Sequence, residues 1–219
     1  MFGLFRRSRG APDAPATLPE GTGGPGGPRP TVAVFPFSRG PGVSSVRPGE
    51  SPPGRDLDSA VALVLAGRFA GAADLSAGDV LLLPAAEARL VSVGPDPGLL
   101  LLSRGEGLAS EALVRVGRDG PSGTPVPGVT GARFLLRSAG RSVLRLGPPP
   151  GARWVVSGLR SFAVFAGKLE VMEGDGGIAV RAGQVAFVDG AGAPLHLLAG
   201  GDSALAIGLG GPDVSVTLA

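Results

Sequence analysis

Short apolar runs separated by turn-forming residues fill most of the chain from residue 31 onward. The first half contains TVAVFPF, AVALVLAGRF, DVLLLP, ARLVSV and GLLLLSR, and the second half contains RSFAVFAGKLEVME, QVAFVD and VSVTLA among others. Several runs alternate in period two, as at Leu169 and Val171 or at Val185 and Phe187, which is typical of half-buried antiparallel strands. The pattern predicts an all-β fold of many short strands. Residues 108–116, LASEALVRV, are the best candidate for a helix, and they could equally form a strand.

The first 30 residues have a different character. Residues 11–30 carry six Pro and five Gly, and such a segment buries too little apolar surface to offset the entropy of ordering it. We therefore expect a disordered tail over residues 1–30. Its tip is either a frayed end or a short docking peptide, in which apolar side chains enter a partner groove beside basic ones: Phe2, Leu4, Phe5, Arg6 and Arg7.

The two halves of the chain share landmarks in the same order. Ala66-Gly67-Arg68 recurs as Ala166-Gly167-Lys168, and Ala77-Gly78-Asp79-Val80 recurs as Ala182-Gly183-Gln184-Val185. RPGESPPG before the first pair corresponds to RLGPPPG before the second. Internal repeats of this kind indicate duplicated structural units.

These landmarks resemble those of the cupin family, and each half is similar to one cupin barrel. The resemblance implies two tandem double-stranded β-helix, or jelly-roll, barrels. We expect the first, degenerate barrel over residues 31–105, a connection with shared strands over 106–140, and the second barrel over 141–219. The second half also resembles the C-terminal β-domain of type I mannose-6-phosphate isomerases, which is not the metal-bearing domain of those enzymes.

Cupins usually bind a metal through a His-x-His pair, a following Glu and a later His. The second-half segment that should carry the pair reads GARWVVSGLRS and has neither His nor Glu. In the first half, Asp56 and Asp58 have the pair spacing, but two carboxylates alone make a weak site for a hard cation. The sequence therefore predicts barrels without a transition metal and without another cofactor.

Composition excludes several other classes. The chain has no Cys, which removes disulfides and thiolate metal sites. Its net charge is only +2 and three arginines lie in the first nine residues, so we expect no nucleic-acid partner. No apolar run approaches the roughly 20 residues of a membrane-spanning helix, and we expect a cytoplasmic protein.

His196 is the only histidine in the chain. It is either a structural side chain or a ligand-binding or acid/base group in the second barrel. Matched to the first half without gaps, its counterpart is Val91. The other candidate ligand-binding residues by the family topology are Arg153, Trp154, Arg160, Lys168 and Gln184, with Trp154 as an apolar wall or as core.

The function that these observations favour is non-catalytic. We expect a metal-free bicupin that binds an anionic or sugar-like small molecule, or that serves as a regulatory or assembly module, with a homodimer as a plausible state. One alternative is a metal-independent sugar or sugar-phosphate isomerase or epimerase that uses His196. Another is a purely structural protein with filled barrels.

Overall fold

The computed structural model describes residues 16–17, 30–52, 60–71, 74–83, 90–104, 114–116, 123–138, 140–173, 176–190 and 193–219. The predicted tail and docking tip, residues 1–30, lie outside these ranges apart from 16–17 and 30. Within them the chain is built from strands, with a single turn of 3-10 helix, η1 (Phe37–Arg39). The all-β prediction is confirmed, and the described part of the helix candidate is a strand, β10 (Val114–Val116).

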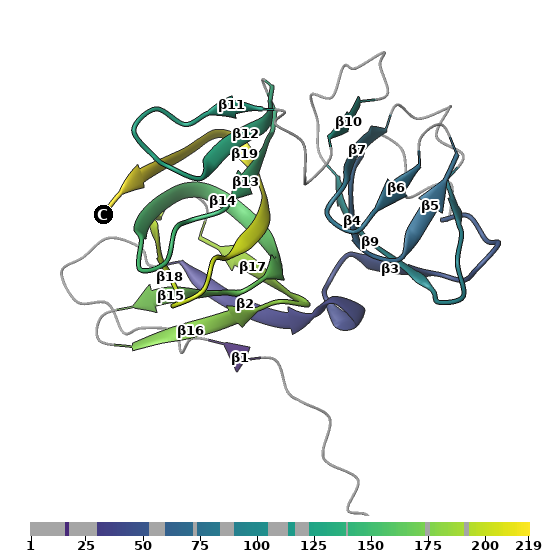
Figure 1. Ribbon diagram of the computed structural model, residues 1–219, viewed down its shortest axis with the longest axis horizontal. Coiled ribbons are helices and arrows are strands. Elements are labelled where there is room, and N and C mark those ends of the chain that lie inside the picture. The colour runs from purple at the N-terminus through teal and green to yellow at the C-terminus, as the bar shows by residue number, and fades with distance from the viewer. Residues whose placement is uncertain are drawn as a thin grey trace, which may run out of the picture.

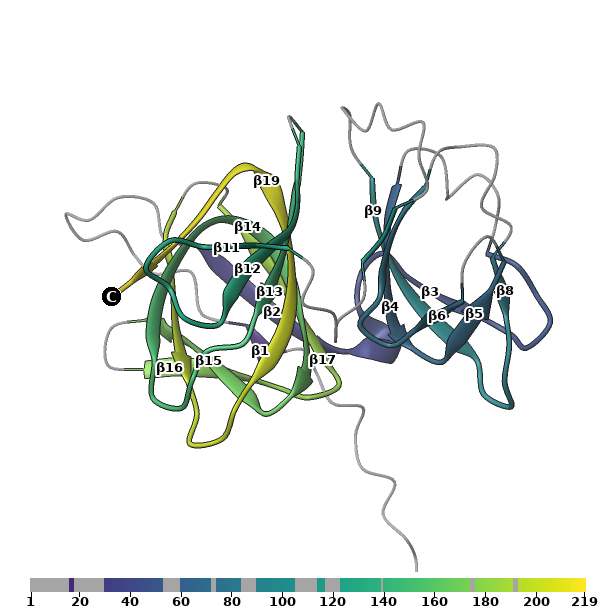
Figure 2. The same ribbon diagram turned by 45° about the horizontal axis from the view of Figure 1, so that its top comes forward.

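Two rolled bodies lie side by side (Figure 1, Figure 2). The strands of the first are β3 (Val43–Val46), β4 (Ala60–Ala66), β5 (Arg68–Ala70), β6 (Leu75–Ser76), β7 (Val80–Leu83), β8 (Val91–Ser92), β9 (Gly98–Arg104) and β10. They form a five-stranded sheet, β10-β7-β4-β9-β3, and a three-stranded sheet, β6-β5-β8.

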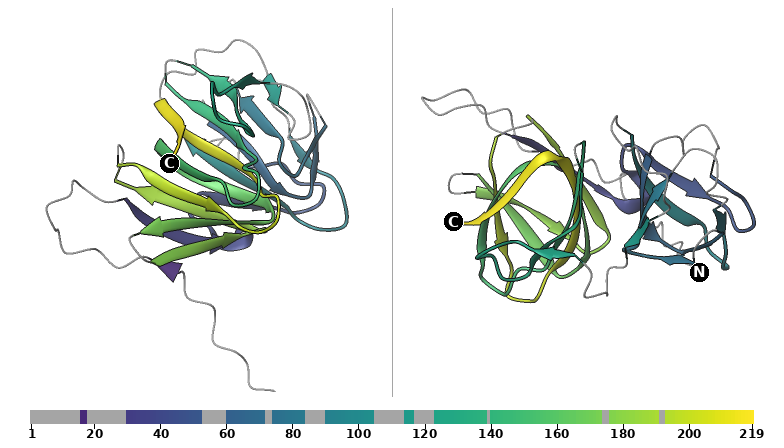
Figure 3. Two further views of the ribbon diagram at one scale, coloured as in Figure 1. Left: turned by 60° about the vertical axis from the view of Figure 1, so that its left-hand side comes forward. Right: turned by 90° about the horizontal axis from the view of Figure 1, so that it is seen from above.

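The second body contains one curled sheet of 11 strands (Figure 3). Its strands are β1 (Ala16–Thr17), β2 (Thr31–Pro36), β11 (Thr124–Pro125), β12 (Ala132–Arg137), β13 (Ser142–Leu146), β14 (Arg153–Ala166), β15 (Lys168–Glu173), β16 (Gly176–Arg181), β17 (Gln184–Asp189), β18 (Leu195–Ala199) and β19 (Leu205–Leu218). The main path is β1-β2-β17-β14-β19-β13-β12-β11, while β15, β16 and β18 continue from β14.

The pairing pattern of the two bodies is the same. The pairs β3–β9, β4–β9, β4–β7, β5–β6 and β5–β8 recur as β13–β19, β14–β19, β14–β17, β15–β16 and β15–β18. The sequence repeat is therefore a repeat of strand topology.

Strand β2 belongs to the second body, although its place in the chain suggests the first. β2 falls in the range predicted for the first barrel, residues 31–105, yet all six of its residues pair with β17. Val32 and Val34 are buried in the apolar core of the second body. Since β10 covers the corresponding edge of β7, the equivalent strands β7 and β17 each pair with an added strand from outside their repeats. The predicted boundary at residue 31 is thus wrong for β2, because an alternating apolar pattern does not specify which sheet a strand joins.

The bodies are joined by a shared apolar cluster. Leu63, Val80 and Leu101 of the first body pack in one cluster with Ala163 and Ile207 of the second. These side chains are all buried. Apolar burial at about 25 cal/mol per Å² is the main force that holds such surfaces together.

Candidate functional site

The glycine landmarks of the repeat are turns that allow close backbone approach. Gly67 and Gly167 both have positive φ, at 80° and 67°. A Cβ added to Gly167 would lie 2.5 Å from the Ser203 carbonyl oxygen, and one on Gly67 would lie 2.9 Å from Gly98 Cα. These positions therefore need glycine for the fold, whatever the barrels bind.

The polar residue of the second landmark caps a turn. The Oδ2 atom of Asp79 accepts a hydrogen bond from the Ser76 N–H at 2.9 Å, and the Oε1 atom of Gln184 accepts one from the Arg181 N–H at 2.8 Å. The equivalent bond in both bodies gives Gln184 a structural role in this turn. Its predicted role in ligand binding stays a prediction.

We expect Gln184→Ala to lower the free energy of unfolding by about 0.5–1.5 kcal/mol, because one backbone donor loses its partner. Gln184→Glu keeps the accepting oxygen and is expected to cost less. Urea denaturation followed by circular dichroism measures both. A loss for Gln184→Ala no larger than that for Gln184→Glu would contradict the capping role.

The segment of β14 where the family carries metal ligands instead faces an apolar interior. Trp154, Val156 and Leu159 are buried in the same core cluster as Phe162 and Val164. Apolar side chains offer no ligand atoms, so these positions pack the barrel. No group of three or more His, Cys, Asp or Glu that could hold a metal ion occurs among the described residues. Asp56 and Asp58 lie outside those residues.

Trp154 is core rather than an open wall. Its side chain is 1% exposed, and its Nε1 atom is buried with no hydrogen-bond partner in the described part of the chain. A buried indole usually finds an acceptor. The packing of the ring therefore offsets the cost of an unpaired N–H.

His196 lies on the outer face of β18. It is exposed, whereas Leu195 and Leu197 on either side are buried. Its partners across the ladder are Val155 on β14 and Met172 on β15. It therefore points away from the barrel interior, and its nearest cross-strand partners are apolar.

The ungapped match between His196 and Val91 is wrong by two residues. Phe69 pairs with Ser92 and Ala70 with Val91, while Leu169 pairs with Ala199 and Glu170 with Leu198. Because Gly67 and Gly167 are equivalent, Val91 corresponds to Leu198. The first loop is shorter than the second, which an ungapped comparison cannot detect.

Three of the predicted ligand-binding residues meet at one surface cavity of about 300 Å³. It is lined by Arg153, Trp154 and His196, together with Met172, Leu197 and Ala219. Arg153 and His196 supply polar groups, and the partly buried Met172 supplies apolar surface. Met172 and Leu197 were not predicted from the sequence, but their pairing with His196 and Trp154 across the strands brings them here.

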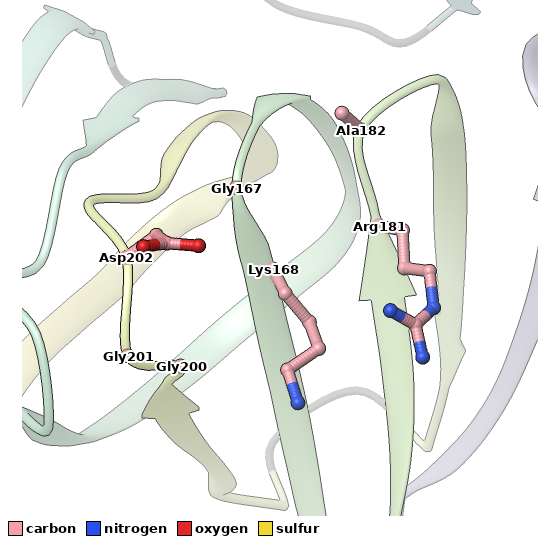
Figure 4. A pocket seen from close by; sticks show the side chains of 7 residues that line it. All are labelled: Gly167, Lys168, Arg181, Ala182, Gly200, Gly201 and Asp202. Carbon is pink, nitrogen blue, oxygen red and sulfur yellow. The ribbon is translucent and has the colours of Figure 1, made fainter.

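The remaining predicted residues lie elsewhere. Arg160 is exposed on β14 and is not among the residues that line the cavity beside His196. Lys168 lines a second cavity of about 310 Å³ with Gly167, Arg181, Ala182, Gly200, Gly201 and Asp202 (Figure 4). The structure thus places Lys168 and His196, both predicted to bind a ligand, at different cavities.

A buried arginine that the sequence did not single out joins the two bodies. Arg141 is 6% exposed, and its Nη1 atom donates hydrogen bonds to the Ser103 carbonyl oxygen and, at 3.0 Å, to Ser103 Oγ. Its Nη2 atom has no partner among the described residues. Burial, together with the positive charge of Arg160, lowers the pKa of Arg141. No local pattern in the sequence indicates this contact, because Ser103 lies on β9, in the other half of the chain.

Within the described residues, no helix is long and apolar enough to cross a membrane. The predicted docking residues Phe2, Leu4, Phe5, Arg6 and Arg7 lie outside the described residues.

Solved structures place this chain with cupin-like folds. A protein of Pseudomonas aeruginosa described as glyoxylate-induced is 12% identical, with a TM-score of 0.56, over 94% of this chain and 79% of that one. Salicylate 1,2-dioxygenase from Pseudaminobacter salicylatoxidans is 12% identical, with a TM-score of 0.52, over 87% of this chain and 75% of that one. A Nostoc punctiforme protein described as a dioxygenase has the same identity and TM-score, over 87% and 72%.

These identities show the fold alone: two tandem cupin-like barrels. No family model matches the sequence, and no curated protein matches it.

Proposed function

We propose that this chain is a non-catalytic cupin-fold module that binds a small anionic molecule on the outer face of its second barrel. The observation that carries the proposal is the cavity of about 300 Å³ at which Arg153, Trp154 and His196 meet. A volume near 300 Å³ is at the lower end of small-molecule sites, which combine apolar walls with a few polar groups.

The lining favours a carboxylate attached to a small apolar group. The guanidinium of Arg153 matches a carboxylate in geometry and charge, and the imidazole of His196 adds a second hydrogen-bonding group. Met172, which is only partly buried, supplies the apolar surface that the rest of such a molecule would contact.

The apolar interior argues against chemistry at the centre of the second barrel. The inward residues of β14, Trp154, Val156 and Leu159, belong to a core with buried residues of the facing strands, such as Leu197 and Val171. This packing favours binding outside the barrel, and it also suits the purely structural alternative. Titration with a small carboxylate separates the two.

The isomerase alternative needs a second acid/base group beside His196. The ladder partners of His196 are Val155 and Met172, which cannot transfer a proton. Arg153 lines the same cavity, but a guanidinium keeps its proton at neutral pH. The geometry therefore favours binding over proton transfer.

Titration with benzoate tests the proposal, with glucose as an uncharged sugar probe. We expect ligand-observed NMR to detect benzoate binding and no glucose binding. Arg153→Gln should weaken benzoate binding about tenfold, the loss of roughly one charge-assisted hydrogen bond. His196→Gln should weaken it by less, since the amide still donates a hydrogen bond.

Arg160→Gln is the matched control, because Arg160 is an exposed arginine of the same strand that does not line the cavity. If Arg153→Gln and Arg160→Gln change benzoate binding equally, the proposed site is contradicted. If benzoate does not bind at all, the purely structural alternative is favoured. Iron, manganese or zinc at one per chain in the purified protein would contradict the metal-free part of the proposal.

A further inference from the structure

The second cavity of the second barrel lies where three connections of the sheet meet. Gly167 is the turn between β14 and β15, Ala182 the turn between β16 and β17, and Gly200–Asp202 the loop from β18 to β19. Figure 4 shows Lys168 and Arg181 extending side by side from neighbouring strands, with Asp202 across from them on the loop. The volume is about 310 Å³.

Among the described residues, two of the charged side chains that line this cavity have no ion-pair partner. Lys168 Nζ lies 2.5 Å from Glu170 Oε1, so its charge is already shared. Arg181 and Asp202 have no ion pair within the described ranges, although they line the same cavity. A free guanidinium and a free carboxylate thus lie on opposite sides, with a lysine between them.

The strand pairing places Lys168 and Arg181 directly opposite each other. Like charges at directly opposed positions of a β-ladder are destabilising. Glu170 pairs with Lys168 and so offsets the charge of Lys168, but not that of Arg181. An anion that contacts Arg181 would relieve the rest.

The glycines of the cavity leave its backbone open. A Cβ added to Gly201 would meet nothing within 4 Å, so the space beside this residue is free for a ligand. Gly200 allows the stem of Lys168 to lie close, since a Cβ there would be 3.1 Å from Lys168 Cε. The lysine is thereby held along the wall and its remaining donors stay available.

We infer that this cavity is a second binding site, for a small carboxylic acid that carries a hydrogen-bond donor, either a hydroxyl or an ammonium group. The ligand carboxylate would pair with Arg181 and accept a hydrogen bond from Lys168, and the donor would reach Asp202. A dianionic phosphate fits less well, because the carboxylates of Asp202 and Glu170 oppose a second negative charge.

The corresponding turns of the first barrel do not repeat this arrangement. Arg68 stands in the place of Lys168, but the counterpart of Arg181 in the aligned turns is Ser76, which pairs with Arg68. The first barrel therefore lacks the second cation. Arg68 serves as the matched control residue.

Isothermal titration of the full chain with D-glycerate, L-serine, propionate and phosphate tests this inference. We expect glycerate or serine to bind at least tenfold more tightly than propionate, which lacks the donor, and more tightly than phosphate. The comparison of glycerate with serine identifies the donor as hydroxyl or ammonium. Tighter binding of phosphate, or equal binding of propionate, would overturn the inference.

Variants then locate the site. Arg181→Gln should weaken glycerate or serine binding at least tenfold, and Asp202→Asn should reduce the preference over propionate. Arg68→Gln and Arg153→Gln should leave this binding unchanged, which separates it from the benzoate site. Arg181 is exposed, so we expect its variant to fold, and circular dichroism checks this. Binding that is insensitive to Arg181→Gln would overturn the assignment.

Discussion

Trp154→Ala is expected to lower the free energy of unfolding by about 3–5 kcal/mol, the usual cost of removing a large buried aromatic side chain. Trp154 is 1% exposed and packs in the core of the second barrel. Its loss would leave a cavity among side chains of the facing strands. Because it is the only tryptophan, denaturation should be followed by circular dichroism rather than by its fluorescence.

Two controls separate packing from other effects. Trp154→Phe keeps most of the apolar volume and removes an N–H that has no partner within the described residues, so we expect a smaller loss, about 1–2 kcal/mol. Leu218→Ala changes a side chain that is 61% exposed and should stay within about 0.5 kcal/mol of the parent. A Trp154→Ala loss no larger than that of Leu218→Ala would contradict a packed interior.

Gly167→Ala is the second change with a large expected effect, a loss of about 2–4 kcal/mol. Alanine there is strained by φ of +67°, and its Cβ would lie 2.5 Å from the Ser203 carbonyl oxygen and 2.9 Å from Ala204 Cα. The backbone must move to relieve these contacts. Thermal unfolding measured by calorimetry reports the loss.

Gly183→Ala is the matched control, since φ is +83° but nothing lies within 4 Å of the added Cβ. We expect it to cost only the conformational strain, about 1–2 kcal/mol. Equal losses at the two positions would show that the close approach at Gly167 does not matter, and that this landmark is an ordinary turn.

The features of the fold that could be predicted from the sequence are the local ones. The alternation at Leu169 and Val171 predicted inward side chains, and both are buried. The repeated landmarks at Gly67 and Gly167 predicted duplicated structural units, and both glycines have positive φ. Such signals are visible because a turn or an alternating strand depends on residues close together in the sequence.

Features that depend on pairing between distant segments could not be predicted. β2 joins β17 across the whole first barrel, and nothing in its apolar pattern distinguishes the two sheets. The ungapped repeat missed the two-residue difference before β18, which moved the counterpart of Val91 from His196 to Leu198. A shift of two residues keeps a side chain on the same face of a strand, but it changes the residues that lie beside it.

The candidate site was predicted in part. The sequence singled out Arg153, Trp154 and His196, which line one cavity, by their residue types and their places in the repeat. The sequence could not show that Lys168 lies at a different cavity, or that it lies opposite Arg181. Both facts depend on how β15 pairs with β16 and β18, and this pairing is known only from the structure.

The most direct test of the filled second barrel is the fluorescence of Trp154, the sole tryptophan of the chain. We predict blue-shifted emission and little quenching by acrylamide or iodide, because the indole is buried in an apolar core. Red-shifted emission that iodide quenches readily in the folded protein would mean that the barrel is open to solvent, and would contradict this structure of the second barrel.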